Sequence, residues 1–327
     1  MTVSRVINRE GNVREETRVR VEAAITALGY VPNTAARKLA GAAQLRIALV
    51  HGNPSRAWLS EVLLGCMAEA GRNDVHLLLE QCDDEAAVLA FARRAAADKL
   101  DGVILPPPFG DSAPVVLPFL TADIPVAVLA TGAPLAGTFA VTIDDNAAAH
   151  DMTRHLISLG HRRIGFIAGD PRQTGSARRL EGYRLALDDA GIVLDPALVV
   201  RGDYTYRSGL HAAQALLALP MPPTAIFASN DDMAAAVIAA AHRLHRNVPE
   251  AISVAGFDDT ALATTISPEL TTIRQPIAAM AQAAIVMLAG AARCRQAGTP
   301  VRPEHRVFPH DIVLRQSVDV PQITARA

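Results

Sequence analysis

Two polar side chains directly follow short apolar segments in the second half of the sequence, where they could bind a small polar molecule. Asn230 comes after the run 225–228, and Asp258 comes after the run 253–255. Each run is typical of a buried strand, and parallel sheets bind ligands beyond the carboxyl ends of their strands. An amide and a carboxylate at that edge can bind hydroxyl groups, which predicts a site for a polyhydroxylated ligand.

The one tryptophan of the chain lies just after the first predicted strand. Trp58 follows the apolar run 47–50 in a chain that has only four tyrosines and eight phenylalanines. An indole at the edge of a cleft can form an apolar plate under a ring of the ligand. The alternative for a solitary tryptophan is a position in the core.

The strand and helix pattern predicts the elements that must hold these side chains. From Arg46 onward, short apolar runs alternate with longer helical patterns, and this alternation begins again near residue 164. It predicts two α/β units with parallel sheets and right-handed crossovers. A late helix (277–292) and a final strand near 311–314 indicate that the chain returns to both units, so that the two enclose a cleft.

Composition and charge narrow the function classes. The chain has 327 residues, of which 50% are hydrophobic, and a net charge of -2, so it can bury large cores but cannot coat nucleic acid. Residues 1–45 alone carry seven basic against four acidic side chains, so any DNA contact is expected at that end. Three scattered cysteines, no apolar run of about 18 residues and no signal-peptide pattern predict a cytoplasmic protein outside the membrane.

Motifs of known enzyme chemistry do not occur in the sequence. There is no G-x-S-x-G, no phosphate-binding P-loop, no H-E-x-x-H and no dinucleotide-binding glycine motif after a strand. The ten histidines are scattered, without metal-ligand spacing. The prediction is therefore a protein that is not an enzyme and has no cofactor and no metal.

Seven sequence segments carry a resemblance to a known family. They are T-V-S-R-V-I-N (2–8), V-E-A-A-I-T-A-L-G-Y-V-P-N-T-A-A-R-K-L-A-G (21–41), G-H-R-R-I (160–164), S-N-D-D-M (229–233), V-A-G-F-D-D-T (254–260), L-T-T-I-R-Q-P (270–276) and V-L-R-Q-S (313–317). Together they resemble the LacI/GalR family of transcriptional repressors. The resemblance implies a helix-turn-helix headpiece, a hinge helix and a two-lobed α/β core of the periplasmic-binding-protein type.

The resemblance also divides the chain into four parts. These are a partial headpiece (1–31), a hinge (32–45), an N-subdomain (46–143 with about 276–303) and a C-subdomain (144–275 with about 304–327). Met1 falls inside the recognition helix of the family pattern, which predicts that the first headpiece helix is missing. We therefore expect that the chain as written cannot bind an operator on its own.

The headpiece and hinge contain the residues that resemble the family's DNA contacts. Arg5 matches the residue that reaches a base edge in the major groove, where a guanidinium can bind guanine. The residues that match phosphate contacts are Thr2, Ser4 and Asn8. The hinge residues that match minor-groove contacts are Asn33, Ala35, Ala36 and Leu39, with Leu39 as the apolar wedge.

The resemblance adds further residues to the predicted effector site. Arg179 matches the family arginine that grips ligand hydroxyls or carboxylates. Trp58, Leu59, Tyr204 and Gln275 match pocket positions of sugar-responsive members. Three neighbouring carboxylates are assigned to helix caps or hinge contacts, namely Asp231, Asp232 and Asp259. Apolar residues replace polar ones of lactose-type relatives at two N-subdomain positions, namely Pro106 and Ala130.

The predicted function is a ligand-responsive repressor of carbohydrate genes. A homodimer would bind a pseudo-palindromic operator if the headpiece is complete, and a sugar-like effector in the cleft would shift the two subunits relative to each other. Whether the effector induces or corepresses is left open. The alternative is a sugar-sensing protein that does not bind DNA, since a transport-type sugar-binding protein would need a signal peptide and would lack the hinge.

Overall fold

The computed structural model describes residues 6, 14–27 and 44–322, which belong to two separate units, Met1–Gln44 and Leu45–Ala327. In the first unit the chain forms helix α2 (Glu15–Ala27). The eight predicted DNA-contacting residues all lie outside the described residues, namely Thr2, Ser4, Arg5, Asn8, Asn33, Ala35, Ala36 and Leu39. Those eight assignments therefore stay predictions.

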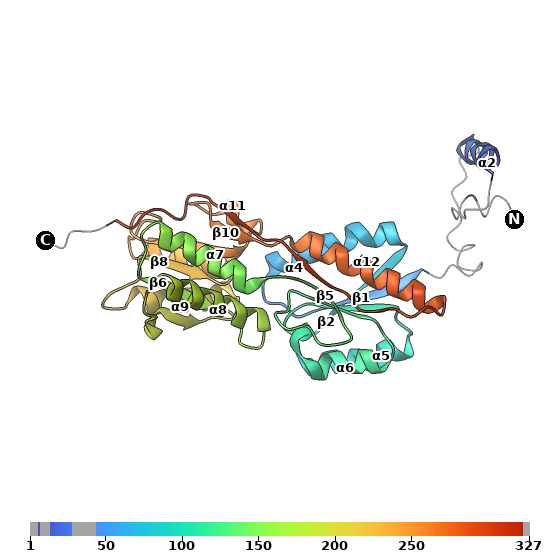
Figure 1. Ribbon diagram of the computed structural model, residues 1–327, viewed down its shortest axis with the longest axis horizontal. Coiled ribbons are helices and arrows are strands. Elements are labelled where there is room, and N and C mark those ends of the chain that lie inside the picture. The colour runs from blue at the N-terminus through green and yellow to red at the C-terminus, as the bar shows by residue number, and fades with distance from the viewer. Residues whose placement is uncertain (1–5, 7–13, 28–43, 323–327) are drawn as a thin grey trace. The chain divides into compact units, whose positions relative to one another are not determined.

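The second unit contains two six-stranded sheets, each the centre of one lobe (Figure 1). The first sheet has the order β11-β5-β4-β3-β1-β2, and all its neighbouring strands are parallel. Its strands are β1 (Leu45–His51), β2 (Val75–Gln81), β3 (Gly102–Leu105), β4 (Val126–Leu129), β5 (Phe139–Ile143) and β11 (His305–Phe308).

The second sheet has the order β12-β10-β9-β8-β6-β7, and only its edge strand β12 runs antiparallel. Its strands are β6 (Ile164–Ala168), β7 (Val199–Arg201), β8 (Ala225–Ala228), β9 (Ser253–Asp258), β10 (Thr271–Arg274) and β12 (Asp311–Val313). The predicted fold of two parallel-sheet lobes is therefore confirmed.

Helices cover both faces of the first sheet. They are α4 (Arg56–Ala70) and α12 (Ile277–Gln296) on one face, and α5 (Glu85–Ala97) and α6 (Ala113–Thr121) on the other. The reason is the alternation of side chains along each strand. Ile47 and Leu49 of β1 pack with α4 and α12, whereas Ala48 and Val50 pack with α5 and α6. Every residue of β1 between Leu45 and His51 except Arg46 is therefore apolar and buried.

The second sheet is covered in the same way. Its helices are α7 (Asp145–Ser158) and α8 (Thr174–Asp189) on one face, and α9 (Tyr206–Leu217) and α10 (Asp231–Arg243) on the other. Phe166 of β6 faces α8, where the ring of Tyr183 stacks on it at 4.8 Å, and Ile167 faces α9 and α10. The short helices are η1 (Gly71–Asn73), η2 (Phe109–Asp111), η3 (Pro196–Leu198) and α11 (Leu262–Thr265).

Several elements differ from the sequence prediction. Strands β5, β10 and β11 and helix α7 were not predicted. The predicted subdomain boundary near residue 303 is wrong, because β11 pairs with β5 in the first sheet and only β12 belongs to the second. The chain thus crosses to the second lobe between Phe308 and Asp311. β11 is mostly exposed and is held by backbone pairing, so its side chains gave no strand signal.

Helix α12 accounts for the most apolar helical stretch of the described residues. By length and composition it is the one described helix that could cross a membrane. However, 61% of its most apolar window is buried inside the protein, where it packs on α4 and on the strands of the first sheet. Core packing therefore explains its composition.

Candidate functional site

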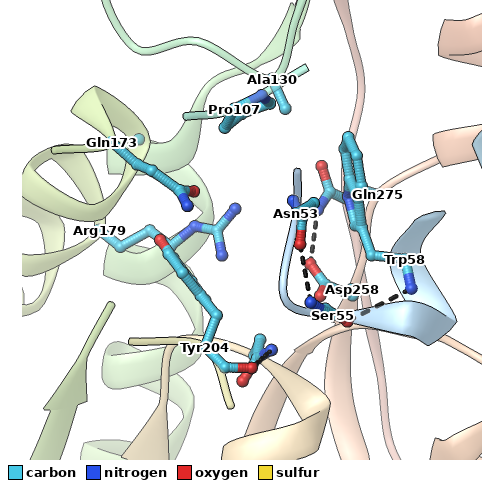
Figure 2. A pocket seen from close by; sticks show the side chains of 12 residues that line it. Asn53, Ser55, Trp58, Pro107, Ala130, Gln173, Arg179, Tyr204, Asp258 and Gln275 are labelled. Atoms are coloured by element: carbon cyan, nitrogen blue, oxygen red, sulfur yellow. Dashed lines mark hydrogen bonds between the residues drawn. The ribbon is translucent and has the colours of Figure 1, made fainter. Parts of the chain in front are cut away.

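A cavity lies between the two lobes, at the carboxyl ends of strands from both sheets (Figure 2). Its empty volume is about 370 Å³, counting its opening to solvent. The lining residues are Asn53, Ser55, Trp58, Pro107, Ala130, Gln173, Gly175, Arg179, Tyr204, Asn230, Asp258 and Gln275.

The first lobe contributes the segment that joins β1 to α4. Asn53 Oδ1 accepts a hydrogen bond from the Ser55 backbone N–H at 2.8 Å, which holds the turn. Ser55 in turn caps α4, because its Oγ accepts from the backbone N–H of Trp58 at 3.3 Å. Trp58 therefore lies in the first turn of the helix with a fixed orientation, and it is 5% exposed.

Arg179 of α8 is the basic residue that the second lobe contributes to the cavity lining. Its Nε donates to Asp145 Oδ1 at 2.7 Å, and its Nη1 donates to the backbone carbonyl of Ser229 at 2.5 Å. The guanidinium also lies 3.6 Å above the ring of Phe257. Both members of the ion pair are buried, so the pair is rigid and shielded from water.

The two charges of this pair depend on each other. Burial opposes the charge of Arg179, but Asp145 beside it raises the pKa of Arg179 above its usual value. Burial raises the pKa of Asp145, and the attraction of Arg179 lowers it. Arg179 is therefore a cation whose charge Asp145 balances inside the protein.

Asn230 uses its side chain mainly within the protein. Its Oδ1 caps α10 by accepting from the backbone N–H of Met233 at 3.0 Å, and its Nδ2 donates to the carbonyl of Tyr204 at 3.0 Å. Of the two roles predicted for Asp231, a helix cap or a hinge contact, the cap of α10 is instead formed by Asn230. Tyr204 has a backbone φ of +68°, and burial raises the pKa of its hydroxyl to about 12.

Asp258 and Gln275 form the opposite wall, next to Trp58 (Figure 2). Gln275 Nε2 donates to Asp258 Oδ1 at 2.5 Å, and both residues are buried. Burial raises the pKa of Asp258 well above its usual value, while Arg179 lowers it and Asp231 raises it further. A protonated Asp258 would donate a hydrogen bond to a ligand oxygen as well as accept one.

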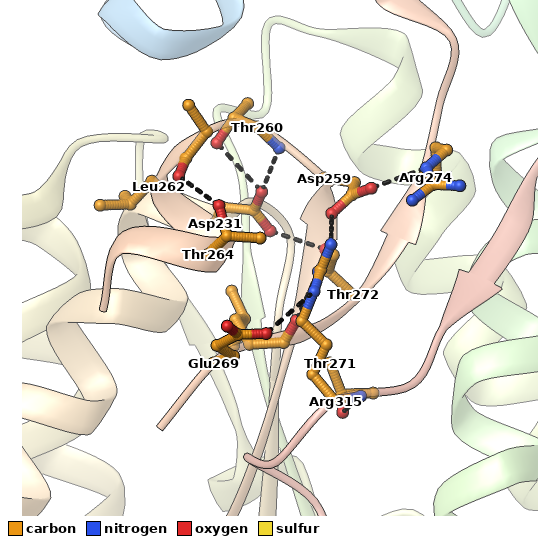
Figure 3. Close-up of polar contacts among 12 residues, drawn as sticks. Asp231, Asp259, Thr260, Leu262, Thr264, Glu269, Thr271, Thr272, Arg274 and Arg315 are labelled. Atoms are coloured by element: carbon orange, nitrogen blue, oxygen red, sulfur yellow. Dashed lines mark hydrogen bonds and ion pairs between the residues drawn. The ribbon is translucent and has the colours of Figure 1, made fainter. Parts of the chain in front are cut away.

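The loop that carries Asp258 has a strained backbone. The φ angles of Asp258 and Asp259 are +115° and +57°, a region that residues with a side chain rarely adopt. Asp259 anchors this loop through ion pairs with Arg274 at 2.7 Å and with Arg315 at 2.6 Å (Figure 3).

Asp231 holds the same loop from beneath. Its Oδ2 accepts from the backbone N–H of Thr260 at 2.8 Å, and its Oδ1 accepts from Thr272 Oγ1 at 2.6 Å (Figure 3). Asp231 and Asp259 thus position Asp258, which lines the cavity. Asp232 instead accepts from Ser55 Oγ of the first lobe at 2.6 Å, so it contacts the other lobe.

Three buried polar atoms of the described residues lack a hydrogen-bond partner. They are Asp145 Oδ2, Gln173 Nε2 and Gln275 Oε1, and the two glutamines line the cavity. Gly175 lines the cavity, and a Cβ atom added to it would lie 3.3 Å from Asp145 Oδ2. Asp145 Oδ2 therefore lies directly behind Gly175 in the cavity wall. Buried polar atoms are rarely left unpaired, and the two that belong to cavity-lining residues are one donor, Gln173 Nε2, and one acceptor, Gln275 Oε1.

The structure brings six of the seven predicted effector residues to this cavity. Leu59 is not among the lining residues: it is half-buried, and its position one residue after Trp58 places it about 100° around α4. Ala130 lines the cavity as predicted, but Pro107 takes the place expected for Pro106.

Sequence reasoning missed several lining residues. Asn53 and Ser55 follow β1 directly, so the rule that found Asn230 and Asp258 would have found them too. Gln173 lies in a loop at the start of α8, and no local pattern marks it. Within the part of the chain that the structure describes, no group of three His, Cys, Asp or Glu side chains could hold a metal ion.

Comparison with known proteins first defines the class of this fold. Residues 153–318 match the model of the periplasmic binding protein-like domain, which agrees with two lobes around a cavity. Residues 1–33 match the model of the bacterial regulatory proteins of the lacI family.

Relatives that match nearly the whole chain define the family. The transcriptional regulator DegA of Bacillus subtilis is 34% identical over 324 residues, covering 97% of this chain and 93% of DegA. The solved complex of the regulator CelR with cellobiose has a TM-score of 0.75 at 30% identity, covering 97% of this chain and 95% of that one. The lac repressor dimer bound to operator and the anti-inducer ONPF has a TM-score of 0.76 at 25% identity, covering 97% and 94%. The chain therefore belongs to the LacI family of bacterial transcriptional regulators, as its sequence motifs predicted.

Proposed function

We propose that this regulator binds a neutral, sugar-like effector in the cavity between its lobes and controls carbohydrate genes in response. The observation that carries this proposal is that one cavity is lined both by the Trp58 ring and by two glutamines with unpaired polar atoms. A sugar ring offers both an apolar face for the indole and hydroxyl groups for Gln173 and Gln275.

The charge of the lining favours a neutral effector over a phosphorylated one. Arg179 is the cation among the lining residues, and Asp145 already balances its charge. An anion would also lie close to the buried Asp258, which would cost electrostatic energy if that carboxyl were ionised.

The relatives support the same assignment. CelR was solved with cellobiose, and the lac repressor was solved as a dimer with operator and a small anti-inducer. By analogy, we propose that this protein acts in the cytoplasm as a homodimer, and that with a complete headpiece it binds a pseudo-palindromic operator. We also propose that it has no enzymatic activity, since the regulators it resembles act through binding.

Fluorescence of Trp58 tests the proposed effector site directly. Because Trp58 is the one tryptophan in the chain, emission excited at 295 nm reports on the cavity alone. We expect a neutral mono- or disaccharide to change this emission and to raise the melting temperature, as ligand binding to the folded state requires. The screen should include sugar phosphates for comparison.

Two variants control this experiment. Asp258→Asn keeps the shape of the side chain and should weaken the response at least tenfold, whereas Arg178→Ala, on the exposed side of α8, should leave it unchanged. If no saccharide changed the emission, or if Asp258→Asn bound as well as the wild type, the cavity would not be the sugar site.

Exposed apolar side chains on one side of the first lobe support the proposed homodimer. Leu64 and Met67 on α4 are 60% and 63% exposed, and Leu79 on the adjacent edge strand β2 is 54% exposed. Large exposed apolar groups that cluster in this way usually mark an interface.

The double substitution Leu64→Glu with Met67→Glu should therefore convert the dimer to a monomer. Analytical ultracentrifugation measures the change, and we expect a shift in the dimer dissociation constant of at least a hundredfold, because two charges would be buried in an apolar contact. Leu117→Glu, at a 53% exposed position on α6, is the matched control and should leave the dimer intact. A dimer that survives the double substitution would place the interface elsewhere.

A further inference from the structure

Helix α8, which carries Arg179, begins without a cap from its own N-cap residue. The side chain of Gln173, at the N-cap position, makes no capping hydrogen bond. In the same lobe, α7, α9 and α10 are each capped by their own N-cap residue, namely Asp144, Thr205 and Asn230. The first turn of α8 therefore depends on a partner from elsewhere in the protein.

That partner is Asp111 of the opposite lobe. Asp111 ends the short helix η2 that follows β3, so it belongs to the first lobe. Its Oδ2 accepts from the backbone N–H of Thr174, the first residue of α8, at 3.2 Å, and its Oδ1 accepts from the Thr174 hydroxyl. A carboxylate in this position also interacts favourably with the positive end of the helix dipole.

Two more first-lobe groups complete this contact. The hydroxyl of Thr131 donates to Asp111 Oδ1 at 2.5 Å, which fixes the orientation of the carboxylate. The backbone N–H of Gly132 donates to Thr174 Oγ1 at 2.7 Å. Thr174 is thus held by Asp111 on one side and by Gly132 on the other, and both bonds cross from one lobe to the other.

The contact lies next to the effector cavity. Gln173 and Gly175, on either side of Thr174, both line the cavity, and Arg179 follows five residues later on the same helix. The bond between Ser55 and Asp232 joins the lobes at a separate point, where α10 begins. Any separation of the lobes must therefore break the Asp111 contact and leave the first turn of α8 uncapped.

The free energy of the Asp111 contact is small enough for the contact to form and break reversibly. We call this contact between the lobes the latch. Burial raises the pKa of Asp111, and the hydrogen bonds from Thr131 and Thr174 lower it. The desolvation of the carboxylate in the closed state is thus partly offset by the bonds that it gains there. A helix cap typically contributes about 1 kcal/mol, which corresponds to a roughly fivefold change in an equilibrium.

We propose that Asp111 is a positioning residue that caps α8 across the cleft and thereby sets the balance between open and closed lobes. In the closed state it holds Gln173 and Arg179 at the cavity. Its effect on effector affinity rests on the proposed function, whereas its effect on lobe closure does not. If only the closed state binds the effector, the apparent affinity equals the affinity of the closed state multiplied by the fraction of protein that is closed.

Acrylamide quenching of Trp58 in the ligand-free protein tests lobe closure without any effector. Trp58 is 5% exposed between the lobes, so opening should raise its quenching constant. We expect Asp111→Ala to shift the balance toward the open state about fivefold or more, and to increase the radius of gyration measured by X-ray scattering. Asp83→Ala removes an exposed carboxylate of the same lobe and is the matched control.

A second substitution separates positioning from mere helix stability. Gln173 has the extended backbone (φ −96°, ψ 117°) of an N-cap residue, so Gln173→Asp can cap α8 from within its own lobe. In the Asp111→Ala background we expect Gln173→Asp to restore the melting temperature and to leave the lobes open. If it also restored low quenching, or if Asp111→Ala quenched like the wild type, the proposed latch would be wrong.

The effector response then decides the second part of the inference. If cellobiose or another saccharide from the screen binds the wild type, Asp111→Ala should weaken this binding by the factor by which quenching shows the closed fraction to fall. Unchanged affinity despite open lobes would overturn the link to the effector. If no saccharide binds the wild type, the proposed function fails while the quenching result still decides the latch.

Discussion

Replacement of Arg179 by methionine is expected to lower the free energy of unfolding by about 3–5 kcal/mol and to abolish effector binding. The reason is that Asp145, with a side chain only 1% exposed, would lose the cation that balances it. The carbonyl of Ser229 would lose a donor as well. Urea unfolding followed by circular dichroism measures the stability change, and Trp58 fluorescence measures binding.

A compensating substitution separates the two effects. In Arg179→Met with Asp145→Asn the uncompensated buried charge is gone, so most of the lost stability should return while effector binding stays absent. Arg178→Met removes the neighbouring arginine, whose ion pair with Glu181 is exposed, and should change stability by less than about 1 kcal/mol. Equal losses from Arg178→Met and Arg179→Met would contradict the central role of the buried pair.

The stability of the wild type is expected to fall as the pH rises from about 4 to 7, because of Asp231. Burial raises the pKa of Asp231 from 3.8 to about 7, although hydrogen bonds from Thr272 and Thr260 lower it. In this window the folded protein keeps a proton that the unfolded chain has released. The free energy of unfolding therefore decreases with pH, with a slope from this group of up to about 1.4 kcal/mol per unit, and this decrease levels off above pH 7.

Asp231→Asn isolates this contribution from other titrating groups. Burial lowers the pKa of His161, which acts in the opposite direction, so the informative quantity is the difference between wild type and variant at each pH. We expect the wild type to lose stability relative to Asp231→Asn from pH 4 to 7, as measured by urea unfolding in a pH series. Asp188→Asn, at an exposed position on α8, should run parallel to the wild type. A constant difference for Asp231→Asn would mean that Asp231 is ionised throughout.

This titration matters for the effector site because Asp231, at the start of α10, is hydrogen-bonded to the loop that follows Asp258. Asp231 binds the backbone of Thr260, two residues after Asp258, and its charge raises the pKa of Asp258. Ionisation of Asp231 would therefore bring a buried negative charge close behind the ligand-facing carboxyl. The positive φ angles of Asp258 and Asp259 are strained, and such angles persist only where surrounding contacts stabilise them. The ion pairs of Asp259 with Arg274 and Arg315 are such contacts.

Local sequence signals were sufficient wherever a residue's place follows from the end of a buried strand. Asn230 and Asp258 were found in this way, because β8 and β9 are short strands with mostly apolar, buried residues and parallel strands present their carboxyl ends at one edge. Trp58, Arg179, Tyr204 and the remaining pocket positions needed the family resemblance, since a single aromatic or arginine has no distinctive spacing. Leu59 was assigned to the pocket from the family resemblance but does not line the cavity. It follows Trp58 by one residue, and one residue along a helix turns the side chain by about 100°.

The sequence by itself determined the class of the protein: two parallel-sheet lobes, the family and the edge of the sheets where a ligand binds. These features follow from patterns within about ten to twenty residues and from motifs that are contiguous in the chain. Only the tertiary structure decided which partners balance the charges. Asp145 pairs with Arg179 across 34 positions, Asp111 caps α8 across 63, and Ser55 meets Asp232 across 177. The physical reason is that hydrogen bonds and burial depend on distance in space, and the crossings between the lobes bring together residues that no local pattern connects.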